Sequence, residues 1–306
     1  MASSDDELRK SADLPSKSKA VVRVLISNME LHIQKYPRLN VLLRAGFHSI
    51  RVVACHTVKR AALMLVRGLP DHWSEKMVFL DKDLRKYVSN HYSMNGEDGI
   101  VEYLFSKISP RNRYFVEIGA VPVRDQSQEP IGMQSNCSLL REKGWSGLSV
   151  ANNWFSQKYA VRQVQISPMN VNEVFRNYGV PNEIDLLSIK FEGQEFWLWS
   201  NLSYSPLVVI IEYNSTIGPD ESKAMPLTTT QALDGTCCYG SSLLAINRLA
   251  ESRSYTLVYA NGVNAIFVLD NLLANAIEFS FERISRQYGQ LKPLRLTPDD
   301  QPWVKI

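Results

Sequence analysis

The segment of this sequence that most clearly suggests a binding site is the apolar run YFVEIGA, residues 114–120, which contains Gly119. A short apolar run that ends in glycine is typical of a buried parallel strand entering a tight turn at the carboxyl edge of a sheet. Turns at that edge commonly hold nucleotide phosphates or an adenosine. The pattern therefore predicts a nucleotide-type site that begins at Gly119 and Ala120.

The elements that must position this turn follow it along the chain. Ser135 is placed to cap a helix through NCSLLREKG, residues 136–144, which ends in glycine. GLSV, residues 147–150, then predicts the neighbouring strand. A capped helix over 167–179 and a strand over 184–189 continue the alternation. Alternating strands and helices favour an α/β fold with a parallel, doubly wound core.

Five further segments follow or precede this turn in a fixed order. They are NGEDGIVEYLFSKI (95–108), GWSGL (144–148), EIDLLSIKFEGQEFWLW (183–199), LVVIIEYN (207–214) and GSSLLAINRLAESRSYTLVYANGVNAIFV (240–268). In this order the six segments resemble the motifs of the FkbM-type class I S-adenosylmethionine (SAM) methyltransferases, over about Asn95 to Leu272. The resemblance implies a Rossmann-like class I methyltransferase fold, with a mostly parallel doubly wound sheet and a C-terminal antiparallel hairpin.

The resemblance also implies a SAM pocket, and three of its features differ in this chain. The family continues its first motif into a Gly-Asp-Gly turn, whereas VPV stands at 121–123 and removes the bare backbone that faces SAM. The acid that would hold both ribose hydroxyls is replaced by Ala151. Of the two aspartates expected after the fourth strand, the first is Lys190, whose charge repels a sulfonium, and the second is kept as Glu192.

These differences predict a vestigial SAM pocket. Its residues are Glu117, Gly119, Ala120, Ala151, Lys190 and Glu192. If a carboxylate hydrogen bond contributes roughly 1.5–3 kcal/mol, losing two weakens SAM binding by on the order of a hundredfold to ten-thousandfold. No cofactor is therefore expected. SAM is expected only under the alternative of an active methyltransferase with a modified pocket, in which Glu117, Glu192 or Glu212 orients a substrate.

Composition restricts the chemistry further. The chain has 306 residues, of which 45% are hydrophobic, enough for one large domain and an appendage. All five histidines precede residue 95, so the predicted domain lacks the commonest general base and zinc ligand. Cys55, Cys137, Cys237 and Cys238 have no metal-binding spacing and are expected to be free thiols. Neither a metal site nor a transmembrane segment is predicted.

The basic charge of the chain is concentrated in residues 20–70. This segment has eight Lys and Arg residues against Glu30 alone, a net charge of +7, whereas the whole chain carries +3. Two amphipathic helices separated at Pro37 are predicted, and the second has a mostly basic face. Three roles remain open: packing on the sheet domain, docking inside a larger assembly, and contact with anionic lipid or RNA.

Five parts of the chain are predicted. They are a polar arm (1–19), the basic helical appendage (20–70), a connector (71–94), the methyltransferase-like domain (95–280) and a C-terminal extension (281–306). The favoured function is a non-catalytic, methyltransferase-like subunit of a large multiprotein assembly, which contacts other subunits through 20–70 and 281–306. By analogy with folds retained in respiratory-chain and ribosomal complexes, a mitochondrial location is expected, and otherwise a cytoplasmic one. The alternatives are the active methyltransferase and an RNA-binding module that uses the basic appendage.

Overall fold

The computed structural model describes residues 77–306, except 125, 127–129, 192, 228–239 and 289–302. The predicted polar arm and basic appendage lie outside the described residues, as do part of the connector and most of the C-terminal extension. None of the helices within the described ranges has both the length and the apolar character needed to cross a membrane.

The chain divides into two units. The larger one, called the sheet domain below, comprises Leu80–Asn271 and Phe279–Ile306. The described part of the other unit consists of residues 77–79 and Leu272–Glu278. Within it the backbone N–H of Val78 donates to Leu272 O (2.8 Å), and that of Ala274 donates to Val78 O (2.9 Å).

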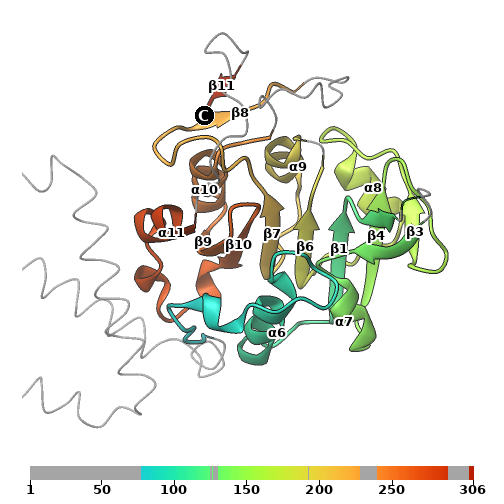
Figure 1. The fold of residues 1–306 in the computed structure, drawn as a ribbon, viewed down its shortest axis with the longest axis horizontal. Coiled ribbons are helices and arrows are strands. Elements are labelled where there is room, and N and C mark those ends of the chain that lie inside the picture. Colours follow the sequence, from blue (N-terminus) through green and yellow to red (C-terminus); the bar gives the residue numbers. More distant parts are fainter. Residues whose placement is uncertain (1–76, 125, 127–129, 192, 228–239, 289–302) are drawn as a thin grey trace, which may run out of the picture. The chain divides into compact units, whose positions relative to one another are not determined.

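The sheet domain is built on a seven-stranded sheet with the order β5-β4-β1-β6-β7-β10-β9 (Figure 1). Its strands are β1 (Tyr114–Ile118), β4 (Ser146–Ala151), β5 (Val161–Gln163), β6 (Leu186–Ile189), β7 (Val208–Glu212), β9 (Tyr255–Ala260) and β10 (Asn264–Leu269). The strands from β5 to β7 pair in parallel, whereas β10 runs antiparallel to both β7 and β9. This confirms the predicted α/β class, with a mostly parallel sheet and an antiparallel C-terminal edge.

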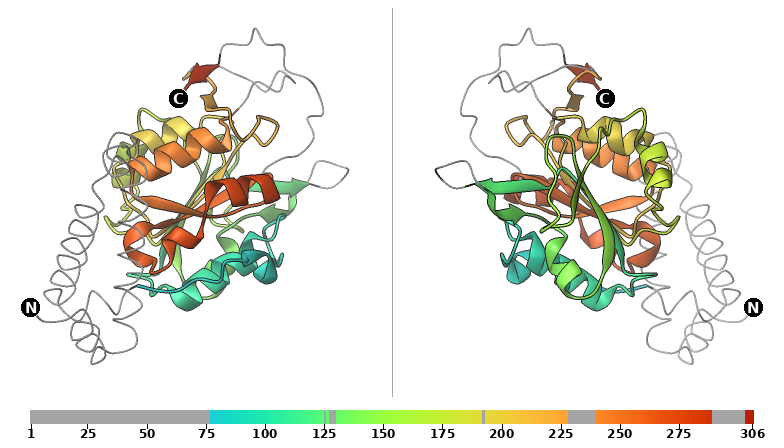
Figure 2. Two further views of the ribbon diagram at one scale, coloured as in Figure 1. Left: turned by 90° about the vertical axis from the view of Figure 1, so that its left-hand side faces the viewer. Right: turned by 90° about the vertical axis from the view of Figure 1, so that its right-hand side faces the viewer.

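Helices cover both faces of the sheet (Figure 2). One face carries α6 (Glu97–Lys107) and α7 (Ser138–Glu142), and the other carries α8 (Val171–Asn177), α9 (Glu195–Asn201) and α10 (Leu243–Ser252). The helix α11 (Phe281–Tyr288) lies beside β9 at the edge of the sheet. Short 3-10 helices are η2 (Leu84–Tyr87), η3 (Asp270–Leu272) and η4 (Ala276–Glu278). Because both faces are covered, the central strands are continuous apolar runs: every residue of β6 is buried.

Ser135 lies just before α7, and Trp199 lies on α9. Ser135 Oγ accepts hydrogen bonds from the backbone N–H groups of Cys137 (3.1 Å) and Ser138 (2.9 Å). The N-cap residue of α7 is Cys137, two positions after the predicted Ser135. Trp199 on α9 is fully buried, with its ring centroid 5.6 Å from that of Tyr255 and 5.4 Å from that of Phe267. Its role is therefore helix-to-sheet packing, as the apolar pattern of α9 predicts.

A hairpin that the sequence analysis did not predict follows β1. Its strands, β2 (Val121–Arg124) and β3 (Pro130–Gln134), pair antiparallel as a separate two-stranded sheet. The proline at position 122 is compatible with this ribbon because each strand has an edge that needs no N–H donor. The VPV segment is therefore a strand that extends from the end of β1, in place of a turn.

The C-terminal residues return to the sheet domain. The strand β11 (Val304–Lys305) pairs antiparallel with β8 (Lys223–Ala224), and Ile306 N donates to Ser222 O at 3.1 Å. Arg248 Nη1 donates a hydrogen bond to Ile306 O. These last residues, for which contact with another subunit was predicted, thus pair with a strand of their own chain.

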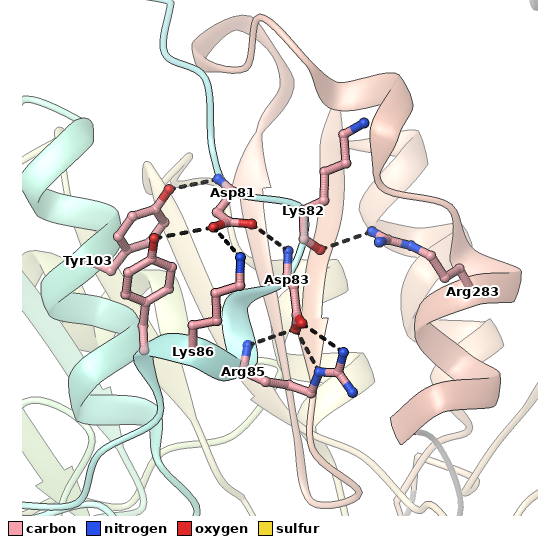
Figure 3. Close-up of polar contacts among 8 residues, drawn as sticks. Asp81, Lys82, Asp83, Arg85, Lys86, Tyr103 and Arg283 are labelled. Carbon is pink, nitrogen blue, oxygen red and sulfur yellow. Dashed lines mark hydrogen bonds and ion pairs between the residues drawn. The ribbon is translucent and has the colours of Figure 1, made fainter.

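A group of charged side chains surrounds η2 on the surface of the domain (Figure 3). We call it the η2 network; its members are Asp81, Asp83, Arg85, Lys86 and Tyr103. Both carboxylate oxygens of Asp83 accept hydrogen bonds from the guanidinium of Arg85, at 2.6 and 2.7 Å. Asp81 Oδ2 accepts from Lys86 Nζ at 3.0 Å, while Asp81 N donates to Tyr103 Oη at 2.7 Å. Every carboxylate in this network thus has a nearby cation.

Candidate functional site

A cavity of about 270 Å³ lies at the carboxyl edge of the parallel strands. It is formed by Gly119 and Ala120 after β1, Ala151 at the end of β4, Lys190 after β6 and Glu212 at the end of β7. We call it the edge cavity. Parallel strands end side by side at one edge of a sheet, and for this reason four segments far apart in the sequence meet here.

The structure brings most of the predicted pocket residues together. Gly119, Ala120, Ala151 and Lys190 line the edge cavity. Glu117 lines a smaller cavity of about 20 Å³, to which Gly119 and Lys190 also contribute. Glu192 lies outside the described residues. The segments that the sequence pattern singled out therefore meet at one edge of the sheet.

Gly119 is required by backbone packing at the floor of the edge cavity. Its φ of +86° is a conformation that residues with a side chain rarely adopt. A Cβ atom at this position would lie 1.6 Å from the carbonyl oxygen of Lys190. The glycine thus lets β1 and β6 end in close contact, and this requirement holds whether or not a ligand binds above it.

One half of the edge cavity, called the apolar half, lies over β1 and β4. Ala120, Met133, Ala151 and Val161 form a buried cluster there, and Trp154 and Tyr159 pack against it. Ala151, at the position where the resembled family holds ribose, is only 6% exposed and belongs to this cluster. The adjacent Asn152 uses its side-chain oxygen to accept a hydrogen bond from Ile166 N at 3.1 Å. The apolar half therefore offers mainly van der Waals contact.

The other half, called the charged half, lies over β6 and β7 and contains Lys190, Glu195 and Glu212. Lys190 Nζ is 3.8 Å from Glu212 Oε2. Glu195, in the first turn of α9, is 3% exposed. Its Oε1 accepts hydrogen bonds from the backbone N–H groups of Phe191 (2.6 Å) and Gly193 (3.1 Å). These bonds fix the loop between β6 and α9.

Burial gives the carboxyl groups of the charged half unusual pKa values. Desolvation raises the pKa of Glu195 to about 7, and the nearby Glu212 adds to the rise, while the backbone hydrogen bonds from Phe191 and Gly193 reduce it. Burial also raises the pKa of Glu212, and Lys190 offsets part of that rise. Glu195 can therefore gain or lose a proton near neutral pH.

Sequence reasoning did not identify Glu195 as a site residue. It is an acid two residues after Gly193 at a strand-to-helix junction, in the otherwise apolar segment QEFWLW. An acid in the first turn of a helix commonly accepts hydrogen bonds from free backbone N–H groups, as Glu195 does. That position was a usable signal for its location, although burial against Glu212 is visible only in the fold.

The carboxylate of Glu117 is held by hydrogen bonds within the protein. Its Oε2 accepts hydrogen bonds from Ser135 Oγ (2.8 Å) and Ser149 Oγ (3.2 Å), and its Oε1 accepts from Asn136 N (2.8 Å). Burial raises its pKa, and these hydrogen bonds partly offset the rise. Glu117 therefore holds the segment that precedes α7 against β1 and β4, and its acceptor capacity is used within the protein.

Among the residues that the structure describes, no group of three or more His, Cys, Asp or Glu side chains is placed to hold a metal ion. Cys137 is a free, buried thiol, as predicted, and burial raises its pKa well above the usual value. The other three cysteines lie outside the described residues.

Comparisons with protein-family models, curated proteins and solved structures gave no match for this chain.

Proposed function

We propose that this chain is a methyltransferase-like protein that no longer binds SAM productively and acts as a non-catalytic subunit of a larger protein assembly. The sheet supports the methyltransferase likeness that the motifs suggest. The reversed strand β10 is inserted between β7 and β9, as in the class I methyltransferase fold that the sequence resembles.

The observation that carries the proposal is the environment of Ala151. A SAM site of the resembled type needs a carboxylate here that accepts hydrogen bonds from both ribose hydroxyls. In this chain the position is buried among Ala120, Met133 and Val161. The two hydroxyls of a bound ribose would lose hydrogen bonds with water and find no carboxylate at position 151 to replace them, which is costly.

Two further features of the edge cavity are also expected to weaken SAM binding. Lys190 stands in the charged half where the resembled family has an acid, so a carboxylate that would face the sulfonium of SAM is replaced by an ammonium group that pairs with Glu212 at 3.8 Å. Val121 and Pro122 line the edge cavity where the family has a glycine-rich turn. Their side chains occupy space that bare backbone would leave open to the methionine end of SAM.

The assembly role is supported by exposed apolar side chains on segments that border the edge cavity. Val121 is 37% exposed, Val123 is 41% exposed, and Phe155, next to the cavity-lining Trp154, is 60% exposed. A partner protein that covered these segments would bury them, as interfaces do with apolar side chains at their centre. The predicted contacts through the basic appendage remain a proposal that rests on the sequence, and the mitochondrial location remains one that rests on analogy.

The SAM part of the proposal is tested by calorimetric titration of SAM and S-adenosylhomocysteine into the full chain. A double variant, Ala151→Glu with Lys190→Asp, is titrated alongside, and its fold is checked by circular dichroism. We expect no binding by the parent chain at millimolar ligand and measurable binding by the double variant. Micromolar binding of SAM by the parent would overturn the proposal and favour the active methyltransferase.

The assembly part is tested by comparing sedimentation of the endogenous chain in a native extract with that of the purified chain. A monomer has a mass of 34.8 kDa. We expect the endogenous chain to sediment in a much larger particle and to co-fractionate with mitochondria. Sedimentation of the endogenous chain as a monomer would contradict a role as an assembly subunit.

A further inference from the structure

The charged half of the edge cavity contains more negative than positive groups among the described residues. Lys190 pairs with Glu212 at 3.8 Å. Glu195 receives two backbone hydrogen bonds on Oε1, whereas no other described residue donates a hydrogen bond to its Oε2. Glu195 also lines the cavity. Glu195 thus has backbone hydrogen bonds but no ion pair with a cation among the described residues.

A ligand cation would compensate this excess. A buried carboxylate without a counter-ion is unfavourable, and a charge-assisted hydrogen bond is one of the strong interactions open to it. A ligand anion would meet Lys190 but also two carboxylates, and Lys190 is already paired with Glu212. The charges thus favour an ammonium group over a carboxylate or phosphate.

The rest of the edge cavity determines what the cation is attached to. Ala120, Ala151 and Trp154 form an apolar wall opposite the charged half. The volume of about 270 Å³ lies just below the range of about 300–1,000 Å³ typical of small-molecule sites. The apolar half therefore suits a short aliphatic or aromatic stem.

We propose that the edge cavity binds a small organic cation, with its ammonium group at Glu195 and Glu212 and its apolar stem against Ala151 and Trp154. Such a ligand needs neither the ribose-binding acid nor the glycine turn whose replacement underlies the proposed function. The inference is consequently independent of that proposal. SAM binding would overturn the proposed function and leave the preference for small amines to be decided by its own experiment.

The test uses three probes of similar size that share a benzyl group and differ in the polar end: phenethylammonium, 2-phenylethanol and phenylacetate. Each is titrated into the full chain at pH 8 by calorimetry, with ligand-observed NMR for weak binding. Since a hydrogen bond to a charged group is worth a factor of about ten or more in affinity, we expect phenethylammonium to bind at least tenfold more tightly than the alcohol. Phenylacetate should bind most weakly.

Two variants locate the charge that is responsible. Glu195→Gln keeps an oxygen that can accept from Phe191 N and Gly193 N, and it should reduce phenethylammonium affinity about tenfold while leaving 2-phenylethanol affinity unchanged. Asp83→Asn removes a carboxylate from the surface η2 network. It should change neither the affinity for phenethylammonium nor that for 2-phenylethanol. Equal affinity for the three probes, tighter binding of phenylacetate, no binding of any probe, or an unaltered Glu195→Gln variant would each overturn the proposal.

Discussion

Two regions of the sheet domain, the η2 network and the charged half of the edge cavity, combine carboxylates with cations. The pKa values of their carboxyl groups are shifted in opposite directions. In the η2 network hydrogen bonds from the Arg85 side chain lower the pKa of Asp83 to about 2. The pKa of Asp81 is also lowered, chiefly by the hydrogen bond from Asp83 N and then by Lys86. In the charged half, burial instead raises the pKa values of Glu195 and Glu212.

The difference shows that proximity of opposite charges does not by itself indicate function. Both regions contain a Lys–carboxylate pair, at 3.0 Å in the η2 network and 3.8 Å in the cavity. The surface pairs are solvated and compensated, so they have little left to offer a ligand. The cavity pair is accompanied by a second, buried carboxylate, Glu195, which has no ion-pair cation, and this excess is what makes the cavity a candidate site.

The largest effect should come from the backbone that holds the edge cavity together. Gly119→Ala would place a Cβ atom 1.6 Å from Lys190 O, and we expect a loss of about 4 kcal/mol or more in the free energy of unfolding. Gly144→Ala is a matched control, since Gly144 has a similar φ of +80° but nothing within 4 Å of the added Cβ. It should cost about 1 kcal/mol, measured by urea denaturation. Equal losses in the two variants would show that φ alone matters.

The next effect is the pH dependence that Glu195 gives to stability. Its pKa is raised from 4.5 to about 7, so the folded state binds its proton more tightly than the unfolded state. Stability from this group is present below pH 4.5 and is lost as the pH rises to about 7, by up to about 3 kcal/mol.

Glu195→Gln removes this titration and should be more stable than the parent at pH 8, while the two should be similar at pH 5. Urea denaturation at both pH values measures the difference. Parallel pH profiles for the parent and the variant would mean that Glu195 is solvated, and the contrast between the cavity and the η2 network would then fail.

A smaller effect is expected for the ion pair in the cavity. Lys190→Gln leaves Glu212 without its cation, raises the pKa of Glu212 further and should cost about 1 kcal/mol at pH 8. The loss should shrink at pH 5, because a protonated Glu212 does not need the ammonium group. Denaturation at the two pH values checks this, and a loss that grows towards pH 5 would contradict the assignment.

The smallest effect is expected in the η2 network. Asp83→Asn removes an exposed ion pair with Arg85, and we expect a change in unfolding midpoint close to the experimental error in physiological salt. A small loss should be detectable only at low ionic strength. If Asp83→Asn destabilises the protein as much as Lys190→Gln does, the distinction between the solvated pair and the partly buried pair of the cavity is wrong for this domain.

The sequence by itself determined the α/β class, the order of the main strands and helices, and the edge of the sheet where Gly119, Ala120, Ala151 and Lys190 meet. It could do so because buried parallel strands require continuous apolar runs, and because glycine and helix-capping residues mark where such strands end. The hydrogen bonds that Ser135 accepts just before α7 follow from the same local rules, although the N-cap position itself is Cys137.

Only the tertiary structure decided how these residues are used. The hairpin formed by β2 and β3 depends on pairing between segments whose local pattern is weak, since Pro122 lies within β2 and Pro130 begins β3. Glu117 and Glu195 are both acids in or beside apolar runs, yet Glu117 binds the side chains of Ser135 and Ser149, while Glu195 binds backbone N–H groups and lines the edge cavity. Desolvation and hydrogen-bond partners depend on neighbours brought in from distant segments, and these a linear pattern does not contain.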